Sequence, residues 1–122
     1  MTETHEAAQS GQLSIDHTSV DGIRVVTLRG EIDHTVKDIL TEALLPPAAA
    51  TPPRTVADLS GVTFMDSSGI NVLVLAHRAT SSAQGWLRIA NASEAVLRVL
   101  QVVGLDDIIP CHPSVEQALT TQ

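Results

Sequence analysis

Residues Ser67–Ser82 read SSGINVLVLAHRATSS, and the choice between helix and strand for this segment determines which architecture the chain can adopt. Its apolar run would suit a strand by residue preference, but the segment is longer than a typical strand. Ser67 or Ser68 could cap a helix at its start. A strand here would also leave the sheet without the crossover that parallel strands require. We therefore predict a helix over Ser67–Ser82.

The chain is predicted to begin its fold with a β-hairpin. The run Leu13–His17 alternates as a half-buried strand would, and the run Ile23–Arg29 is rich in valine and isoleucine. Asp21-Gly22 lies between them and is typical of a tight hairpin turn. The two strands should therefore pair antiparallel.

A helix and a third strand are expected next. Apolar residues recur at helical spacing after Thr35, and Thr35 or Asp33 could serve as the N-cap. Pro46-Pro47 must end this helix, because proline cannot continue it. The stretch Pro46–Pro53 is then a loop of proline and alanine, and the short apolar run Thr55–Leu59 fits a buried strand.

After Ser82 short strands and helices continue to alternate. We expect a strand at Trp86–Ala90, a helix from Ser93 to Val103 that Gly104 ends, a short strand around Ile108-Ile109, and a last helix near Ser114, where Gln117 completes a capping box. The predicted order is β-β-α-β-α-β-α-β-α, which implies right-handed crossovers after the hairpin. The fold class is therefore α/β, with a mixed, mostly parallel sheet of about five strands and four helices.

Composition narrows the domain organisation and the classes of function. The chain has 122 residues, of which 43% are apolar and 17% charged, as expected for one globular domain. Residues 12–122 should form that domain, and residues 1–11, which lack periodicity, a mobile tail. The net charge of −7 would repel a phosphate backbone, which argues against direct nucleic-acid binding.

Targeting segments and metal sites are not expected. The chain has neither the pattern of a secretory signal nor the ~20 consecutive apolar residues of a membrane span, so we expect a cytoplasmic protein without membrane contact. The one cysteine, Cys111, adjoins His112, and the five histidines lack metal-ligand spacing. We therefore expect no metal and no cofactor.

Two predicted loops should meet at one edge of the sheet. One is Gly30–His34, after the second strand, and the other is Gly61–Ser68, after the third. Parallel strands place their C-terminal loops on the same edge, where open α/β sheets commonly bind ligands. We therefore expect Asp33 and Ser67 to lie near each other in a site.

Both loops resemble segments of one protein family. The run Asp58–Ile70, DLSGVTFMDSSGI, resembles the signature of anti-sigma factor antagonists of the STAS domain family, in which a serine after the second aspartate is phosphorylated. The segment Gly30–Thr35, GEIDHT, is similar to a second family segment. The predicted order of elements also agrees with a STAS domain.

The resemblance implies a partner-switching cycle without catalysis by this chain. The unphosphorylated protein would bind an anti-sigma factor that is also a serine/threonine protein kinase, and thereby free a sigma factor. Phosphorylation of Ser67 would release the kinase, and a phosphatase of the PP2C type would restore the cycle. The implied or candidate partner-binding residues are Glu31, Asp33, His34, Asp66, Ser68, Gly69 and Val72.

Other interpretations of the same residues remain open. Asp33 and Thr35 could act only as helix caps, and Ile70–Ala76 could be core packing. A serine hydrolase is excluded, because Met65 occupies the first glycine position of the Gly-x-Ser-x-Gly turn. A STAS scaffold, or a small-ligand-binding module without this phosphorylation, is the alternative function.

Overall fold

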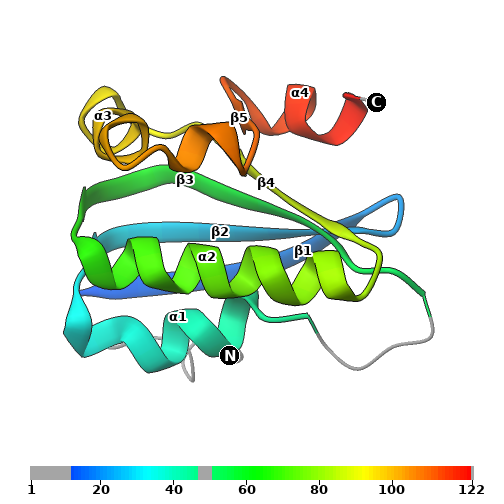
Figure 1. The fold of residues 1–122 in the computed structure, drawn as a ribbon, viewed down its shortest axis with the longest axis horizontal. Coiled ribbons are helices and arrows are strands. Elements are labelled where there is room, and N and C mark those ends of the chain that lie inside the picture. Colours follow the sequence, from blue (N-terminus) through cyan, green and yellow to red (C-terminus); the bar gives the residue numbers. More distant parts are fainter. Residues whose placement is uncertain (1–11, 47–50, 122) are drawn as a thin grey trace.

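The computed structural model describes residues 12–46 and 51–121. In these residues a five-stranded sheet, in the order β1-β2-β3-β4-β5, is flanked by four helices (Figure 1). The predicted tail and part of the proline-rich loop lie outside the described residues. The elements are β1 (Leu13–Val20), β2 (Ile23–Ile32), α1 (Lys37–Leu44), β3 (Arg54–Met65), α2 (Ser67–Ser82), β4 (Trp86–Ala90), α3 (Glu94–Val102), β5 (Cys111–His112) and α4 (Val115–Thr120).

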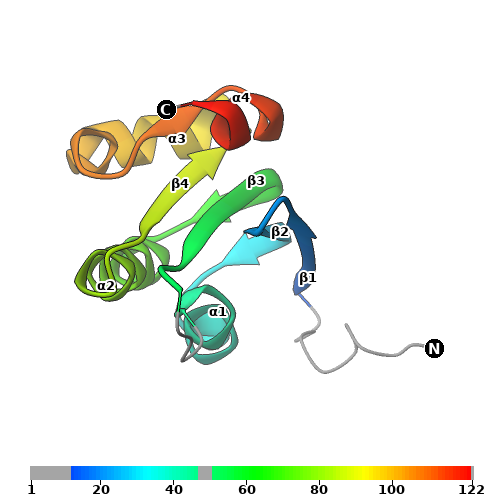
Figure 2. The ribbon, with the colours of Figure 1, turned by 90° about the vertical axis from the view of Figure 1, so that its right-hand side faces the viewer.

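The sheet is mixed, as predicted. Strands β1 and β2 pair antiparallel, whereas β2 with β3, β3 with β4 and β4 with β5 pair parallel. Figure 2 shows α1 and α2 on one side of the sheet and α3 and α4 on the other. The parallel strands are thus covered on both faces, which is the usual arrangement of an α/β domain.

The hairpin turn between β1 and β2 has the predicted residues. Asp21 has a φ of 52° and Gly22 a φ of 81°. Two successive positive φ angles are what a two-residue turn with the right-handed twist of a hairpin requires. The register Val20↔Ile23 closes the hairpin directly on this turn.

Aliphatic side chains build the core. The segment whose assignment was ambiguous in the sequence forms α2 over Ser67–Ser82, as predicted, and buries Val72, Leu73 and Ala76. Helix α1 ends at Leu44, because Leu45, which precedes a proline, is extended with a ψ of 141°.

No helix among the described residues is long and apolar enough to cross a membrane.

Strand β3 is longer than predicted. It continues past Leu59 to Met65, so the expected loop Gly61–Ser68 is strand for most of its length. Its register with β2 shifts at two irregularities. Such bulges break the period-2 alternation of buried and exposed residues, and the exposed Thr63 and Phe64 look like loop residues in the sequence.

The predicted strand at Ile108-Ile109 is wrong, because the fifth strand is β5, Cys111–His112. Residues Leu105–Asp107 form a 3-10 turn, and Ile109 is fully buried in the core. Both isoleucines have strand preference, but Ile109 packs in the core and Ile108 is exposed to solvent. Backbone pairing with β4 begins only at Pro110, whose carbonyl accepts from the Ile89 N–H at 2.9 Å.

Candidate functional site

The C-terminal ends of β2 and β3 lie side by side. Ile32 is the register partner of Met65, and the Asp66 N–H donates a hydrogen bond to the Ile32 carbonyl at 3.1 Å. The residues that follow each strand are Asp33 on one side and Asp66-Ser67 on the other. The structure thus brings together the two segments that the sequence placed at one edge.

Each of these strand ends passes into a helix through an aspartate cap. The Asp33 carboxylate accepts from the Thr35 N–H at 2.9 Å and from the Thr35 hydroxyl at 2.6 Å. The Asp66 carboxylate accepts from the Ser68 N–H at 2.8 Å. Asp33 is therefore the N-cap of the turn before α1, and Thr35 is its donor.

The predicted cap of α2 is wrong. Neither Ser67 nor Ser68 caps this helix, because the residue before them, Asp66, has the extended backbone of an N-cap and its carboxylate accepts from the Ser68 N–H. Ser67 is instead the first helical residue, and its side chain is exposed. The Ser67 hydroxyl is therefore free of the structural role that the sequence offered for it.

Asp33 carries a negative charge at neutral pH. Hydrogen bonds, first of all the one that the Thr35 hydroxyl donates, lower the pKa of the Asp33 carboxyl below its ordinary value. Glu31 is exposed one residue before the end of β2, and Asp66 is half-buried. We call Glu31, Asp33 and Asp66 the acidic rim, and Ser67 lies in it.

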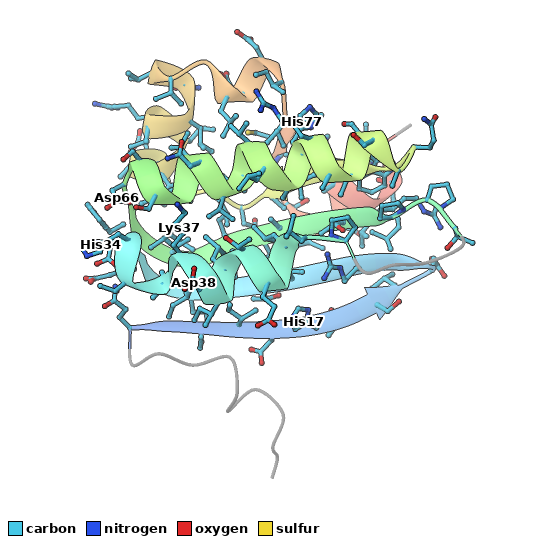
Figure 3. The ribbon with its side chains drawn as sticks, turned by 60° about the horizontal axis from the view of Figure 1, so that its bottom comes forward. His17, His34, Lys37, Asp38, Asp66 and His77 are labelled. Carbon is cyan, nitrogen blue, oxygen red and sulfur yellow. The ribbon has the colours of Figure 1, made fainter. Side chains whose placement is uncertain are left out.

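Two cationic or titratable side chains lie at the same end of the molecule. Figure 3 shows His34 and Lys37 near Asp66, where α1 and α2 begin. His34 and Lys37 are both exposed. Among the residues that the structure describes, no three His, Cys, Asp or Glu side chains gather as metal ligands would.

Two of the predicted partner-binding residues, Val72 and Gly69, are buried. Val72 has no exposed surface, so the expectation that its side chain meets a partner is corrected to core packing. Gly69 is also buried, and a Cβ there would lie 2.7 Å from Met65 Cγ and 2.8 Å from Ile32 Cγ2. Gly69 thus lets α2 approach the ends of both strands. The large apolar side chain that α2 exposes to solvent is instead Leu75, which is 48% exposed.

Phe64 is the residue that sequence reasoning missed. It is 50% exposed and is the register partner of Glu31, so an aromatic side chain lies next to the acidic rim. The register shifts between β2 and β3 interrupt the alternation of buried and exposed residues, and this alternation would otherwise have predicted that Phe64 is exposed. The available signal was chemical: the only phenylalanine of the chain lies three residues before Ser67.

The family model of the STAS domain matches residues 14–118. The chain belongs to the STAS domain family. The match includes both segments that carry the resemblance in the sequence, Gly30–Thr35 and Asp58–Ile70, and every strand end described above. The family assignment from the sequence is thereby confirmed.

Named relatives of this STAS domain are anti-sigma factor antagonists. It is 36% identical over 108 residues to the anti-sigma-F factor antagonist RsfA of Mycobacterium tuberculosis, which covers 82% of this chain and 80% of the relative. It is 34% identical over 84 residues to the anti-sigma-B factor antagonist of Bacillus subtilis, which covers 69% of this chain and 76% of that protein. The crystal structure of an anti-sigma factor antagonist from Mycobacterium paratuberculosis superposes with a TM-score of 0.75 at 29% identity, over 88% of this chain and 92% of that one.

Proposed function

We propose that this protein is a non-enzymatic anti-sigma factor antagonist of the cytoplasm, switched by phosphorylation of Ser67. Its unphosphorylated form binds an anti-sigma factor serine/threonine kinase and frees a sigma factor. The observation that carries the proposal is the division of roles at the start of α2, where Asp66 caps the helix and Ser67 is exposed. The names of its relatives as anti-sigma factor antagonists support the same function.

The chemistry of the switch is a single phosphoryl transfer. The Ser67 Oγ attacks the γ-phosphorus of ATP, the hydroxyl proton passes to a base of the kinase, and ADP leaves. The product carries an added charge of about −1.5 to −2 at pH 7. The first turn of a helix, with unpaired N–H groups and the positive end of the helix dipole, tolerates such an anion. The fold therefore survives the modification.

Release of the kinase follows from charge and desolvation. A kinase that has just phosphorylated Ser67 holds ADP opposite it, so the new phosphate faces the phosphates of the nucleotide across the interface. The acidic rim adds further negative charge on the same side. Like charges that are forced together at an interface cost several kcal/mol, and each 1.4 kcal/mol is about a tenfold change in affinity. The phosphorylated protein therefore dissociates.

Mass spectrometry of the phosphorylated protein tests this function. The protein is incubated with ATP and the kinase that co-purifies with it from its native cells, and the site of added phosphate is mapped. We expect phosphate on Ser67 in the natural protein and in Ser68→Ala, no phosphate in Ser67→Ala, and removal of the phosphate by a PP2C-type phosphatase. Phosphate on Ser68 alone would refute the assignment. A scaffold or small-ligand module would acquire no phosphate at all.

Phe64 should contribute to kinase binding. An exposed aromatic side chain beside the modified serine is the kind of residue that dominates the binding energy of an interface. We expect Phe64→Ala to weaken kinase binding by about tenfold or more without loss of stability, because the ring is half exposed. Calorimetry with the unphosphorylated protein measures the affinity.

Leu75→Ala is the matched control for this prediction. Leu75 is exposed to the same degree as Phe64 but lies two turns into α2, away from the acidic rim. It should bind the kinase like the natural protein. If both variants lose affinity equally, the contact surface does not centre on the end of β3.

A further inference from the structure

Lys37 is the only lysine in the chain, and it begins α1. Its side chain is exposed. Figure 3 shows it on the side of α1 that faces α2, near Asp66 at the start of α2. A flexible cation therefore lies at an edge that is otherwise acidic.

The backbone limits how far Lys37 can be from Ser67. The Asp66 N–H is hydrogen-bonded to the Ile32 carbonyl at 3.1 Å, and Ser67 is the next residue. Between Ile32 and Lys37 the chain makes a single 3-10 turn, His34–Val36. Because such a turn advances only about 2 Å per residue, the Lys37 backbone is separated from the end of β2, against which α2 begins, by little more than this one turn. The four-carbon stem of lysine covers much of that distance.

The other nearby cations are less suitable. The stem of Arg29 lies against Gly61, further back along β2 and β3 and away from the start of α2. His34 is exposed in the turn before α1 and is shorter than a lysine. The charged or titratable groups at this edge are thus Glu31 from β2, Asp33 and His34 from the turn, Lys37 and Asp38 from α1, and Asp66 before α2.

We propose that Lys37 pairs with the phosphate on Ser67 and holds it against the start of α1. This inference rests on the proposed modification of Ser67. An added dianion beside Glu31, Asp33 and Asp66 is repelled by its surroundings, and one ammonium group at close range offsets that repulsion. The pairing favours the dianionic form of the phosphate and hinders its access to a phosphatase. Lys37 thereby prolongs the released state of the switch.

The second pKa of the phosphate reports this pairing directly. Phosphoserine is placed at position 67 of the full chain during synthesis, without any kinase, and the phosphate is titrated by phosphorus NMR at physiological ionic strength. We expect Lys37→Gln to raise this pKa by about half a unit, which corresponds to the loss of a unit charge at roughly 6 Å in a solvated site. Lys37→Arg should restore most of the natural value.

Arg78→Gln is the matched control, because it removes the same charge from an exposed position three turns along α2. At that distance screening by salt should leave the phosphate pKa almost unchanged. The pairing is refuted if Lys37→Gln behaves like the natural protein or like Arg78→Gln. It is also refuted if the Lys37 effect disappears in a His34→Gln background. Because no kinase is used, failure of the proposed kinase reaction would not alter this result.

Discussion

Ser67→Asp is expected to bind the cognate kinase about 100-fold more weakly than the natural protein, whereas Ser67→Ala should bind with undiminished affinity and resist release by ATP. The aspartate places a permanent negative charge at the first position of α2, in the middle of the acidic rim. A buried or like-charge anion in the interface costs several kcal/mol, which accounts for a change of this size.

The same substitution should leave the domain intact. A carboxylate in the first turn of a helix interacts favourably with the helix dipole, so the stability of Ser67→Asp should equal or slightly exceed that of the natural protein. Calorimetry with ADP-loaded kinase measures the affinities, and urea unfolding verifies the fold. Equal affinities of the two variants in a folded state would reject Ser67 as the switch.

Gly30→Ala should reduce the free energy of unfolding by about 3 kcal/mol or more. Gly30 has a φ of 116°, a conformation that residues with a Cβ rarely adopt. An added Cβ would also overlap the carbonyl oxygen of Gln12 and come within 2.9 Å of its carbon atom. Relief of that overlap must displace β1 and disturb the hydrogen bond from the Glu31 N–H to the Gln12 carbonyl.

Gly104→Ala separates backbone strain from the steric effect. Gly104 also has a positive φ, of 77°, but a Cβ there would meet no atom within 4 Å. Its substitution should cost about 1 kcal/mol, from backbone strain alone. Urea denaturation of both variants provides the comparison. If Gly30→Ala cost no more than Gly104→Ala, the close approach of Gln12 would not constrain the edge that carries Glu31 and Asp33.

The sequence predicted those elements in which several local signals agree. Helix α2 combines polar cap residues, sufficient length and the need for a crossover, and its predicted bounds match the structure. The turn at Asp21-Gly22 and the start of the last helix at Ser114 were equally clear, because each depends on residues close in sequence. The nearness of Asp33 and Ser67 followed from topology alone.

The errors arose where tertiary packing overrides local preference. Strand β3 extends to Met65 because β2 continues beside it through two irregularities, which no pattern in β3 by itself reveals. Ile109 has the preference of a strand residue, but it lies outside the strand and its side chain is buried in the core. Val72 lies in a helix that is apolar on several faces, so the sequence alone does not show which of these faces packs into the core.

The cap of α2 was misassigned for a different reason. Asp66, Ser67 and Ser68 are all good N-cap residues, and sequence preference does not rank three in a row. The hydrogen bond from the Asp66 N–H to the Ile32 carbonyl selects the first of them, because it fixes Asp66 at the end of the sheet in an extended conformation. Residues distant in sequence thus decide which hydroxyl is exposed.

The hydrogen bond between the Asp66 N–H and the Ile32 carbonyl also fixes the ends of β2 and β3 relative to each other. Glu31 and Asp33 cannot move relative to Ser67 without breaking a backbone bond between parallel strands. A partner that binds both segments, as proposed above, would therefore meet them in a fixed relative position, and the proposed phosphorylation of Ser67 would change the charge of this surface rather than its shape. If Ser67 is phosphorylated as proposed, the two forms would interconvert without refolding of the domain.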